Sequence, residues 1–376
     1  MLYYTRFIAC IFLFTSINFC TNNTIQAQPT QSAQQEAFKK IDSFLQSLVD
    51  TANIPGIAIA ITSGDRIIHS KGFGVVNVST GKSLQSFHNF HIASISKTFT
   101  ATAVMQLTER GKIDINKPLT SYLPYFRMAD KRYKIITIKQ LLNHTSGMPD
   151  VEDYEWEKNI IDAGAAERYT RSLADSQLIS DPGKEYHYSN IAFDIMADLV
   201  AKVSGKTFET YVKDNILIPL GMNKSSFYYP ETDTSLRTSP HMGNPSQPSS
   251  VYPYNRMHAP SSTLNTSADE LAHWAIANLN DGKYKDKSIL KPVTLQQMMT
   301  PTFLTNRDRN VSIGLCWFSY PYRGSTNIEH GGGDLGYRTM LTLIPDKKLG
   351  IVLLCNHEDV RIYDMRNKIR DILLDL

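Results

Sequence analysis

The stretch that decides the fold is HIASISKTFTA, residues 91–101. It places Ser94 and Lys97 three residues apart at the start of an apolar helix. Residues at this spacing share a helix face, so the lysine amine can reach the serine hydroxyl. The pair supplies a nucleophile together with its base, and a helix N-terminus favours developing negative charge. Because two common residues recur at a fixed spacing by chance, the prediction depends on what accompanies them.

A second segment is Tyr188-Ser189-Asn190, which follows a Pro-Gly turn at residues 182–183. A Pro-Gly turn can present the loop after it to a cleft. Tyr188 and Asn190 would then supply a phenol and an amide on one side.

The third segment is His330-Gly331-Gly332-Gly333, with Gly336 shortly beyond it. Glycines beside a strand permit close backbone approach, so a substrate could lie along the strand and bond to it. A tight turn between strands is the alternative interpretation.

Apolar periodicity predicts an α/β (α+β) fold. Strands near both termini, with helices between them, imply a central antiparallel sheet flanked by helices. An inserted, mostly helical lobe is expected at about residues 94–290. The Pro-, Ser- and Asn-rich residues 231–263 predict a long surface loop or a flap that shapes the substrate site. The helices are expected at 32–49, 98–110, 138–143, 191–204, 268–279 and 360–374, and the strands at 57–61, 67–76, 311–320, 339–344 and 350–355.

The composition and the missing motifs exclude some classes of function. The chain has 376 residues, 42% hydrophobic and 20% charged, with a formal net charge of +3 and no basic run. Nucleic acid is therefore excluded as a partner. The sequence contains neither H-E-x-x-H nor a cysteine pair at zinc spacing, so we expect no metal and no cofactor.

The first 27 residues predict a signal peptide. Arg6 is the only charge among the first 35 residues, residues 7–19 are mostly apolar, and Ile25-Gln26-Ala27 is a suitable cleavage site. The apolar run of about 13 residues is short for a membrane span. We expect an exported protein, periplasmic or secreted, with residues 28–376 as one domain; an uncleaved anchor is the alternative. The bulky Phe19 disfavours lipid anchoring through Cys20.

Two cysteines remain after the signal peptide, Cys316 and Cys355. Both lie in apolar, strand-like runs, which predicts buried thiols. A disulfide between them is left open.

The three segments, in this order, resemble the serine β-lactamase and penicillin-binding-protein superfamily, in its class C-like branch of esterases, D-aminopeptidases and D-Ala-D-Ala carboxypeptidases. Its motifs are matched by Ser94-x-x-Lys97, Tyr188-x-Asn190 and His330-x-Gly332. The resemblance spans about residues 38–356. Further matches are Ile54-Pro55-Gly56, LLNHTSGMP at 141–149 and IPLGM at 218–222.

The resemblance implies a catalytic set of Ser94, Lys97 and Tyr188. Ser94 would form an acyl-enzyme that water hydrolyses. At pH 7 an unperturbed lysine pays about 4.6 kcal/mol to be neutral, and a tyrosine about 4 kcal/mol to be a phenolate. Burial would lower the first pKa and nearby cationic charge the second, so the base stays unassigned between them.

The substrate-binding set implied by the resemblance is Asn190, His330, Gly332 and Gly333. Asn190 would hold the carbonyl of the acyl side chain and orient Lys97. The backbone N–H groups of Ser94 and Gly333 would form an oxyanion hole. His144 is interpreted as structural, holding the turn that follows it.

Two departures from the family bear on specificity. His330 stands where β-lactamases carry lysine, and a histidine is mostly neutral at pH 7, so the cation that faces a substrate carboxylate is weakened. Arg338 could replace it, although a surface arginine is favoured. Ala259-Pro260-Ser261-Ser262 replaces a Gly-Gly pair, which predicts a stiffer loop.

The sequence therefore predicts an exported serine hydrolase acting on esters or amides, of the esterase or D-amino-acid peptidase type. The alternatives are a penicillin-binding-like or β-lactamase protein and a catalytically idle peptidoglycan-binding sensor. The expected partner is a small-molecule or peptide substrate, possibly derived from the cell wall. Oligomeric state is left open.

Overall fold

The computed structural model describes residues 31–376, so the predicted signal peptide lies outside the described residues. Its core is an eight-stranded antiparallel sheet in the order β2-β1-β14-β13-β12-β11-β10-β9. The strands are β1 (Gly56–Ser63), β2 (Arg66–Gly74), β9 (Phe303–Asn306), β10 (Val311–Ile313), β11 (Phe318–Tyr322), β12 (Ser325–Asp334), β13 (Tyr337–Ile344) and β14 (Leu349–Cys355). Short pairs join β3 (Phe90–His91) to β6 (Asn265–Thr266), β4 (His241–Met242) to β5 (Gln247–Pro248), and β7 (Lys283–Tyr284) to β8 (Lys287–Ser288).

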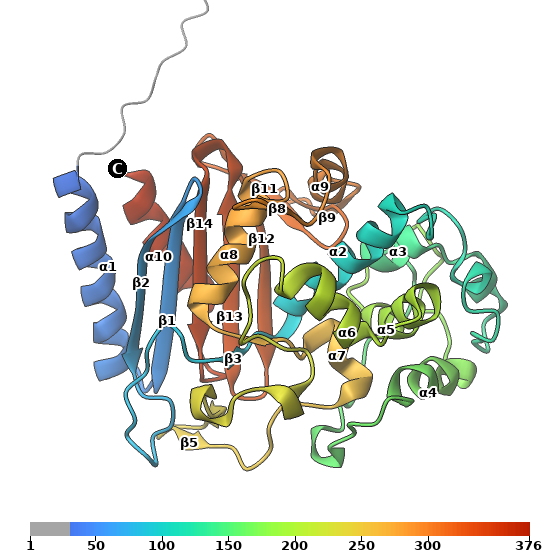
Figure 1. Ribbon diagram of the computed structural model, residues 1–376, viewed down its shortest axis with the longest axis horizontal. Helices are drawn as coiled ribbons and strands as arrows, with labels where there is room; N and C mark the ends of the chain where they lie inside the picture. The colour runs from blue at the N-terminus through green and yellow to red at the C-terminus, as the bar shows by residue number, and fades with distance from the viewer. Residues whose placement is uncertain (1–30) are drawn as a thin grey trace, which may run out of the picture.

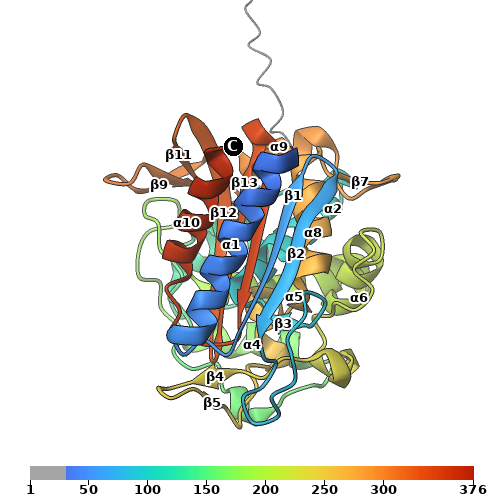
Figure 2. The same ribbon diagram turned by 90° about the vertical axis from the view of Figure 1, so that its left-hand side faces the viewer.

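The first strand of the sheet pairs with the last strand in the sequence, near one edge of the sheet. β1 pairs with β14, with Ile57 opposite Cys355. Figure 2 shows α1 (Gln31–Thr51) and α10 (Ile362–Leu374) across one face, and α8 (Ala268–Leu279) covers the other in Figure 1. Both faces are covered, so β1 is buried from Gly56 to Thr62 rather than alternating with solvent. The predicted fold class is confirmed.

The remaining helices form a lobe beside the sheet (Figure 1). α2 is buried on almost every side, which explains why its sequence is weakly amphipathic. α8 lies within the range expected for the lobe but packs on β14 and β1, so the lobe ends before it. The helices are α2 (Ser96–Glu109), α3 (Ile138–Leu142), α4 (Ala165–Ser172), α5 (Asn190–Ser204), α6 (Phe208–Val212) and α7 (Ala259–Ser262), with α9 (Pro292–Met299) near β9.

Two expectations about local structure are wrong. The single strand predicted at 311–320 is broken into β10 and β11 by a turn, in which Cys316 has a φ of +77°. The Gly314 N–H closes this turn by donating to the Trp317 carbonyl at 2.8 Å, and only glycine fits there because a Cβ would lie 2.2 Å from the Met298 carbonyl. The surface loop predicted at 231–263 is wrong for its last part: many residues up to 252 are exposed or half-buried, whereas most from 253 onward are buried and lead into α7.

Cys316 and Cys355 are buried free thiols. Across residues 31–376, no helix has the length and apolar character needed to cross a membrane. The same residues hold no group of three or more His, Cys, Asp or Glu side chains placed to bind a metal.

Candidate active site

The turn that carries Ser94 is a 3₁₀ turn, Ala93–Ile95, and α2 begins only at Ser96. Ala93 has a φ of +47°, a left-handed conformation that costs a non-glycine residue energy and persists only when its surroundings impose it. Two distant segments supply the restraint. The Ile92 N–H donates to the Leu264 carbonyl at 2.9 Å, and Thr339 Oγ1 donates to the Ile92 carbonyl at 2.8 Å.

Lys97 lies behind Ser94 and is fully buried. Its Nζ is 2.8 Å from Ser94 Oγ and donates to the Ser261 carbonyl of α7, also at 2.8 Å. Burial lowers the pKa of Lys97 to about 8, and the negative charge of Asp194 is the largest effect opposing it. Neutral Lys97 is therefore easier to form at pH 7 by about 3 kcal/mol than an unperturbed lysine.

Tyr188 borders the same site. Burial raises its pKa well above the usual 10, and a hydrogen bond with Ser94 is the largest effect opposing that rise. The expectation that nearby cationic charge would lower this pKa is wrong, because desolvation dominates. Lys97 Nζ lies 5.1 Å from the centre of the phenol ring.

His144 holds the segment that carries Tyr188. Its ring stacks on the Tyr188 ring with centroids 4.2 Å apart, and its Nδ1 accepts the Ser189 N–H at 3.1 Å. Burial and the neighbouring Lys97 charge keep its pKa well below 6.5, so the ring is neutral. Its geometry is that of a structural residue, and it supports Tyr188 as well as its own turn.

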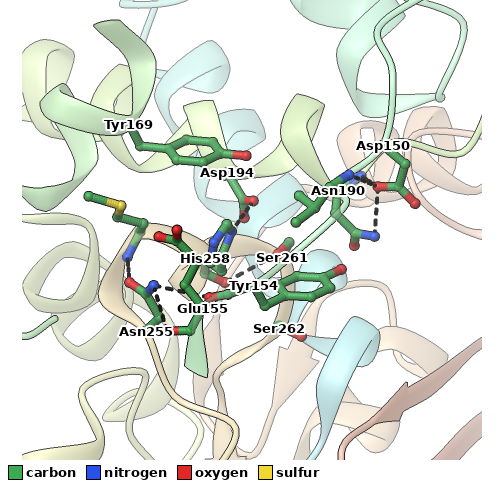
Figure 3. Close-up of polar contacts among 12 residues, drawn as sticks. Asp150, Tyr154, Glu155, Tyr169, Asn190, Asp194, Asn255, His258, Ser261 and Ser262 are labelled. Atoms are coloured by element: carbon green, nitrogen blue, oxygen red, sulfur yellow. Dashed lines mark hydrogen bonds and ion pairs between the residues drawn. The ribbon is translucent and has the colours of Figure 1, made fainter. Parts of the chain in front are cut away.

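Asn190 begins α5, two residues after Tyr188. Its side-chain N–H donates to Asp150 Oδ1 at 2.9 Å, and its backbone N–H donates to the same oxygen at 2.7 Å. Within residues 31–376, no hydrogen bond joins Asn190 to Lys97. Figure 3 shows the amide group facing Asp150. Sequence reasoning missed Asp150, although it directly follows the LLNHTSGMP motif.

His330, Gly332 and Gly333 lie in β12 rather than in a turn. The pairing of β11 with β12 stops at Phe318 opposite Glu329, so from His330 onward β12 has β13 on one side and an open edge on the other. Burial lowers the pKa of His330 to about 3, so the ring is neutral. Its Nδ1 lies 2.7 Å from the Gly331 carbonyl and therefore carries the proton that it donates there.

Ser94, Tyr188 and this open edge line one cavity of about 820 Å³. A serine hydroxyl from the turn before α2, a buried amine from α2, a phenol from the loop before α5 and the free edge of β12 thus converge. A family model described as Beta-lactamase matches residues 41–373. The chain belongs to the β-lactamase family.

Two relatives found by sequence comparison agree with this membership. The chain is 28% identical over 334 residues to Protein flp of Staphylococcus aureus, covering 87% of this chain and 64% of that protein. It is also 28% identical to Beta-lactamase-like protein 2 of Dictyostelium discoideum, covering 93% and 65% respectively. The chain thus spans just under two thirds of these relatives.

Two solved structures share the fold of this β-lactamase-family chain. One is the octameric penicillin-binding protein homologue from Pyrococcus abyssi, with a TM-score of 0.79, 24% identity, and 90% and 77% of the two chains covered. The other is a β-lactamase/D-alanine carboxypeptidase from Pseudomonas syringae, with a TM-score of 0.76, 20% identity, and 90% and 99% covered.

The cavity of this β-lactamase-family protein contains arginines that the sequence did not place there. Arg338, favoured as a surface residue, lines the cavity together with Arg309 and Arg366. Arg366 forms an ion pair with the buried Glu329. In the described part of the chain, Arg309 and Arg338 form no ion pair, and Arg338 donates to the carbonyls of Asp334 and Tyr337. Positive charge is therefore present beside the neutral His330.

A buried pair behind Lys97 was also missed. His258 Nδ1 lies 2.7 Å from Asp194 Oδ2, and both side chains are buried (Figure 3). His258 immediately precedes α7, and its carbonyl accepts the Ser261 hydroxyl at 3.2 Å. Asp194 on α5 thereby fixes the short helix whose Ser261 carbonyl receives Lys97. The sequence signal for this buried pair was Asp194, a charged residue inside the mostly apolar run 191–200.

Replacing Gly332 with alanine is expected to destabilise the fold and displace the turn that carries Ser94. A Cβ at Gly332 would lie 2.4 Å from the Ile92 carbonyl, which is backbone and cannot rotate away. We expect a loss of about 1–3 kcal/mol, measured by chemical denaturation. Gly333→Ala is the matched control, because its Cβ would meet only the Arg338 side chain, at 3.2 Å or more. Equal stability of the two variants would contradict the packing described.

Proposed function

We propose that the protein is a serine hydrolase that acts on esters or amides through an acyl-enzyme on Ser94. The observation that carries the proposal is the buried Lys97 amine, 2.8 Å from Ser94 Oγ, whose pKa is lowered to about 8. A group with that pKa can accept a proton near neutral pH and return it. Membership of the β-lactamase family supports the same class of chemistry.

The residues account for each step. Neutral Lys97 takes the hydroxyl proton as Ser94 Oγ forms a bond to the acyl carbon. The bond to the leaving group then breaks, and the proton passes to the leaving atom. Tyr188, held neutral by its raised pKa, relays that proton and is not the initial base. Water cleaves the acyl ester and restores the Ser94 hydroxyl.

The oxyanion of each tetrahedral intermediate would lie between the backbone N–H groups of Ser94 and Gly333. Such a donor contributes about 3 kcal/mol or more in comparable enzymes. The open edge of β12 gives a substrate backbone a strand to pair with. An exported esterase or D-amino-acid peptidase fits a site whose His330 is neutral.

A second candidate is a D-alanine carboxypeptidase or β-lactamase. Arg309 and Arg338 in the cavity favour it, because either guanidinium could hold the carboxylate that those substrates present. The structural neighbour from Pseudomonas syringae is named for both activities.

The direct test is detection of the acyl-enzyme. The protein is incubated with p-nitrophenyl butyrate, quenched in acid and analysed by intact mass, and a penicillin and a D-alanyl-D-alanine peptide are run in parallel. We expect release of p-nitrophenol and a mass increase of one butyryl group on the peptide containing Ser94. Absence of both hydrolysis and adduct with all three substrates would refute the proposal.

The pH dependence of kcat/KM is expected to show an acidic limb near pH 8. Below the Lys97 pKa the amine is protonated and cannot accept the Ser94 proton, so activity rises as pH increases through that value. His330, with its pKa near 3, contributes no limb in this range. Initial rates between about pH 6 and pH 10 measure the profile. A flat profile would contradict Lys97 as the base.

Asp194→Asn is expected to move that limb to lower pH by roughly half a unit or more. The Asp194 charge is the strongest effect raising the Lys97 pKa, so its removal allows burial to lower that pKa further. The other groups facing Lys97 are Asp150, Asp334, Cys316, Tyr188, His144 and His330. Asp198→Asn, one turn further along α5, is the control and should leave the limb in place. The same shift in both variants would show a general effect of altering α5.

A further inference from the structure

Asp150 dictates how the amide of Asn190 is oriented. A carboxylate only accepts hydrogen bonds, so the side-chain nitrogen of Asn190 must face Asp150 Oδ1, 2.9 Å away. The amide oxygen must then point elsewhere. The nitrogen carries two N–H donors, so one is held by Asp150 and the other remains available.

The amide oxygen of Asn190 is itself a buried acceptor that lacks a donor. The side chain is only 7% exposed, and within the described residues its Oδ1 has no hydrogen-bond partner. An unsatisfied buried polar atom costs about 1–3 kcal/mol. In Figure 3 this oxygen is turned away from Asp150, toward the Tyr154 ring.

Asp150 is the second acceptor. Its carboxylate is exposed, and across residues 31–376 it forms no ion pair. The other two carboxylates near Lys97 differ, because Asp194 contacts His258 and Asp334 contacts His91, each at 2.7 Å. A cation from outside the chain could therefore approach Asp150 without displacing a partner.

An aromatic face completes the group. Tyr154 stacks on Trp156 with ring centroids 4.6 Å apart, and Asn255 donates to the Tyr154 carbonyl at 3.1 Å, which fixes the loop. Asp150 and Tyr154 begin the same loop, and Asn190 lies two residues after Tyr188. The charge of Asp150 acts on both Lys97 and Tyr188, so the group lies close to the two side chains beside Ser94. A carboxylate, a free carbonyl oxygen and an aromatic face are the features that recognise an ammonium ion.

We propose that Asp150, Asn190 and Tyr154 form an ammonium-binding subsite, so that the preferred substrates are aminoacyl esters or amides with a free amino group. The inference rests on the proposed function and narrows its substrate class. The substrate ammonium would donate to Asn190 Oδ1 and to the Asp150 carboxylate while its carbonyl carbon faces Ser94.

The test compares two substrates of equal size. Alanine p-nitroanilide carries an ammonium, and lactic acid p-nitroanilide carries a hydroxyl in its place. We expect kcat/KM to favour the alanyl substrate by about tenfold or more. Asp150→Asn keeps an acceptor for the Asn190 N–H but removes the charge, so the ratio of the two kcat/KM values should fall toward one, whatever the change in the lactyl rate itself. Glu152→Gln, an exposed acid in the same loop, is the matched control and should keep the parent preference.

Two results would overturn the subsite while leaving the serine hydrolase intact. One is equal kcat/KM for the two substrates in the parent, and the other is a preference that survives Asp150→Asn. If neither anilide is hydrolysed, calorimetry with Ser94→Ala compares alaninamide with lactamide, because binding does not need turnover. Tighter binding of alaninamide that depends on Asp150 would support the subsite; equal or undetectable binding of both would overturn it.

Discussion

Ser94→Ala is expected to lower kcat for p-nitrophenyl butyrate by about ten-thousand-fold or more. The variant lacks the oxygen that forms the acyl bond, while Lys97 keeps its second hydrogen bond, to the Ser261 carbonyl. The site should therefore remain assembled but lose covalent chemistry. Initial rates measured beside the parent, with thermal unfolding of both proteins, test this expectation.

Ser96→Ala separates loss of the nucleophile from damage to the turn. Ser96 lies two residues away, is buried, and accepts the Leu264 N–H at 3.0 Å. Its removal should lower stability by about 1 kcal/mol and leave most of the activity. Ser94→Ala retaining the parent rate would exclude Ser94 as the nucleophile.

Lys97→Met is expected to reduce kcat/KM by about a thousand-fold, since it removes the general base and a hydrogen bond to Ser94. Methionine retains an unbranched side chain in a site that is closed to water. The buried amine is costly to the fold, so stability should hold or rise, although the Ser261 carbonyl loses its donor. Steady-state kinetics and thermal unfolding measure the two effects.

The pH profile distinguishes a lost base from a general defect. Residual activity of Lys97→Met should lack the limb near pH 8, because no group with that pKa remains beside Ser94. Lys202→Met is the control: Lys202 is exposed and pairs with Glu167 away from the site, and the variant should keep both rate and profile. A limb that persists in Lys97→Met would assign it to another group.

Much of the fold was predictable because its signals are local. The β1–β2 hairpin, α5 and α8 follow from periodicity and turn residues, and α8 begins and ends where predicted. Ser267 caps α8 by accepting the Glu270 N–H at 3.1 Å. The break between β10 and β11 was not predictable, because it depends on Gly314 packing against Met298, a contact made in three dimensions.

The candidate site likewise has a part that the sequence predicts and a part that depends on packing in three dimensions. The spacing of Ser94 and Lys97 within one helical turn was enough to place the two side chains in contact. Residues that contact the site from distant parts of the sequence were harder to predict. Asp150 and His258 lie in segments without periodicity, and their partners, Asn190 and Asp194, are far away in sequence. The raised pKa of Tyr188 depends on burial, which a single sequence does not reveal.

The left-handed turn at Ala93 has a consequence for the order of events during synthesis. Its restraints come from Leu264 and from Thr339 on β13, both of which leave the ribosome long after Ser94. β13 is held in the sheet by β14, which in turn pairs with β1. A growing chain that has already displayed Ser94 and Lys97 therefore lacks the scaffold that orients them. We therefore expect the proposed activity to be absent until β13 and β14 are in place, so that a measurement of activity would report complete assembly.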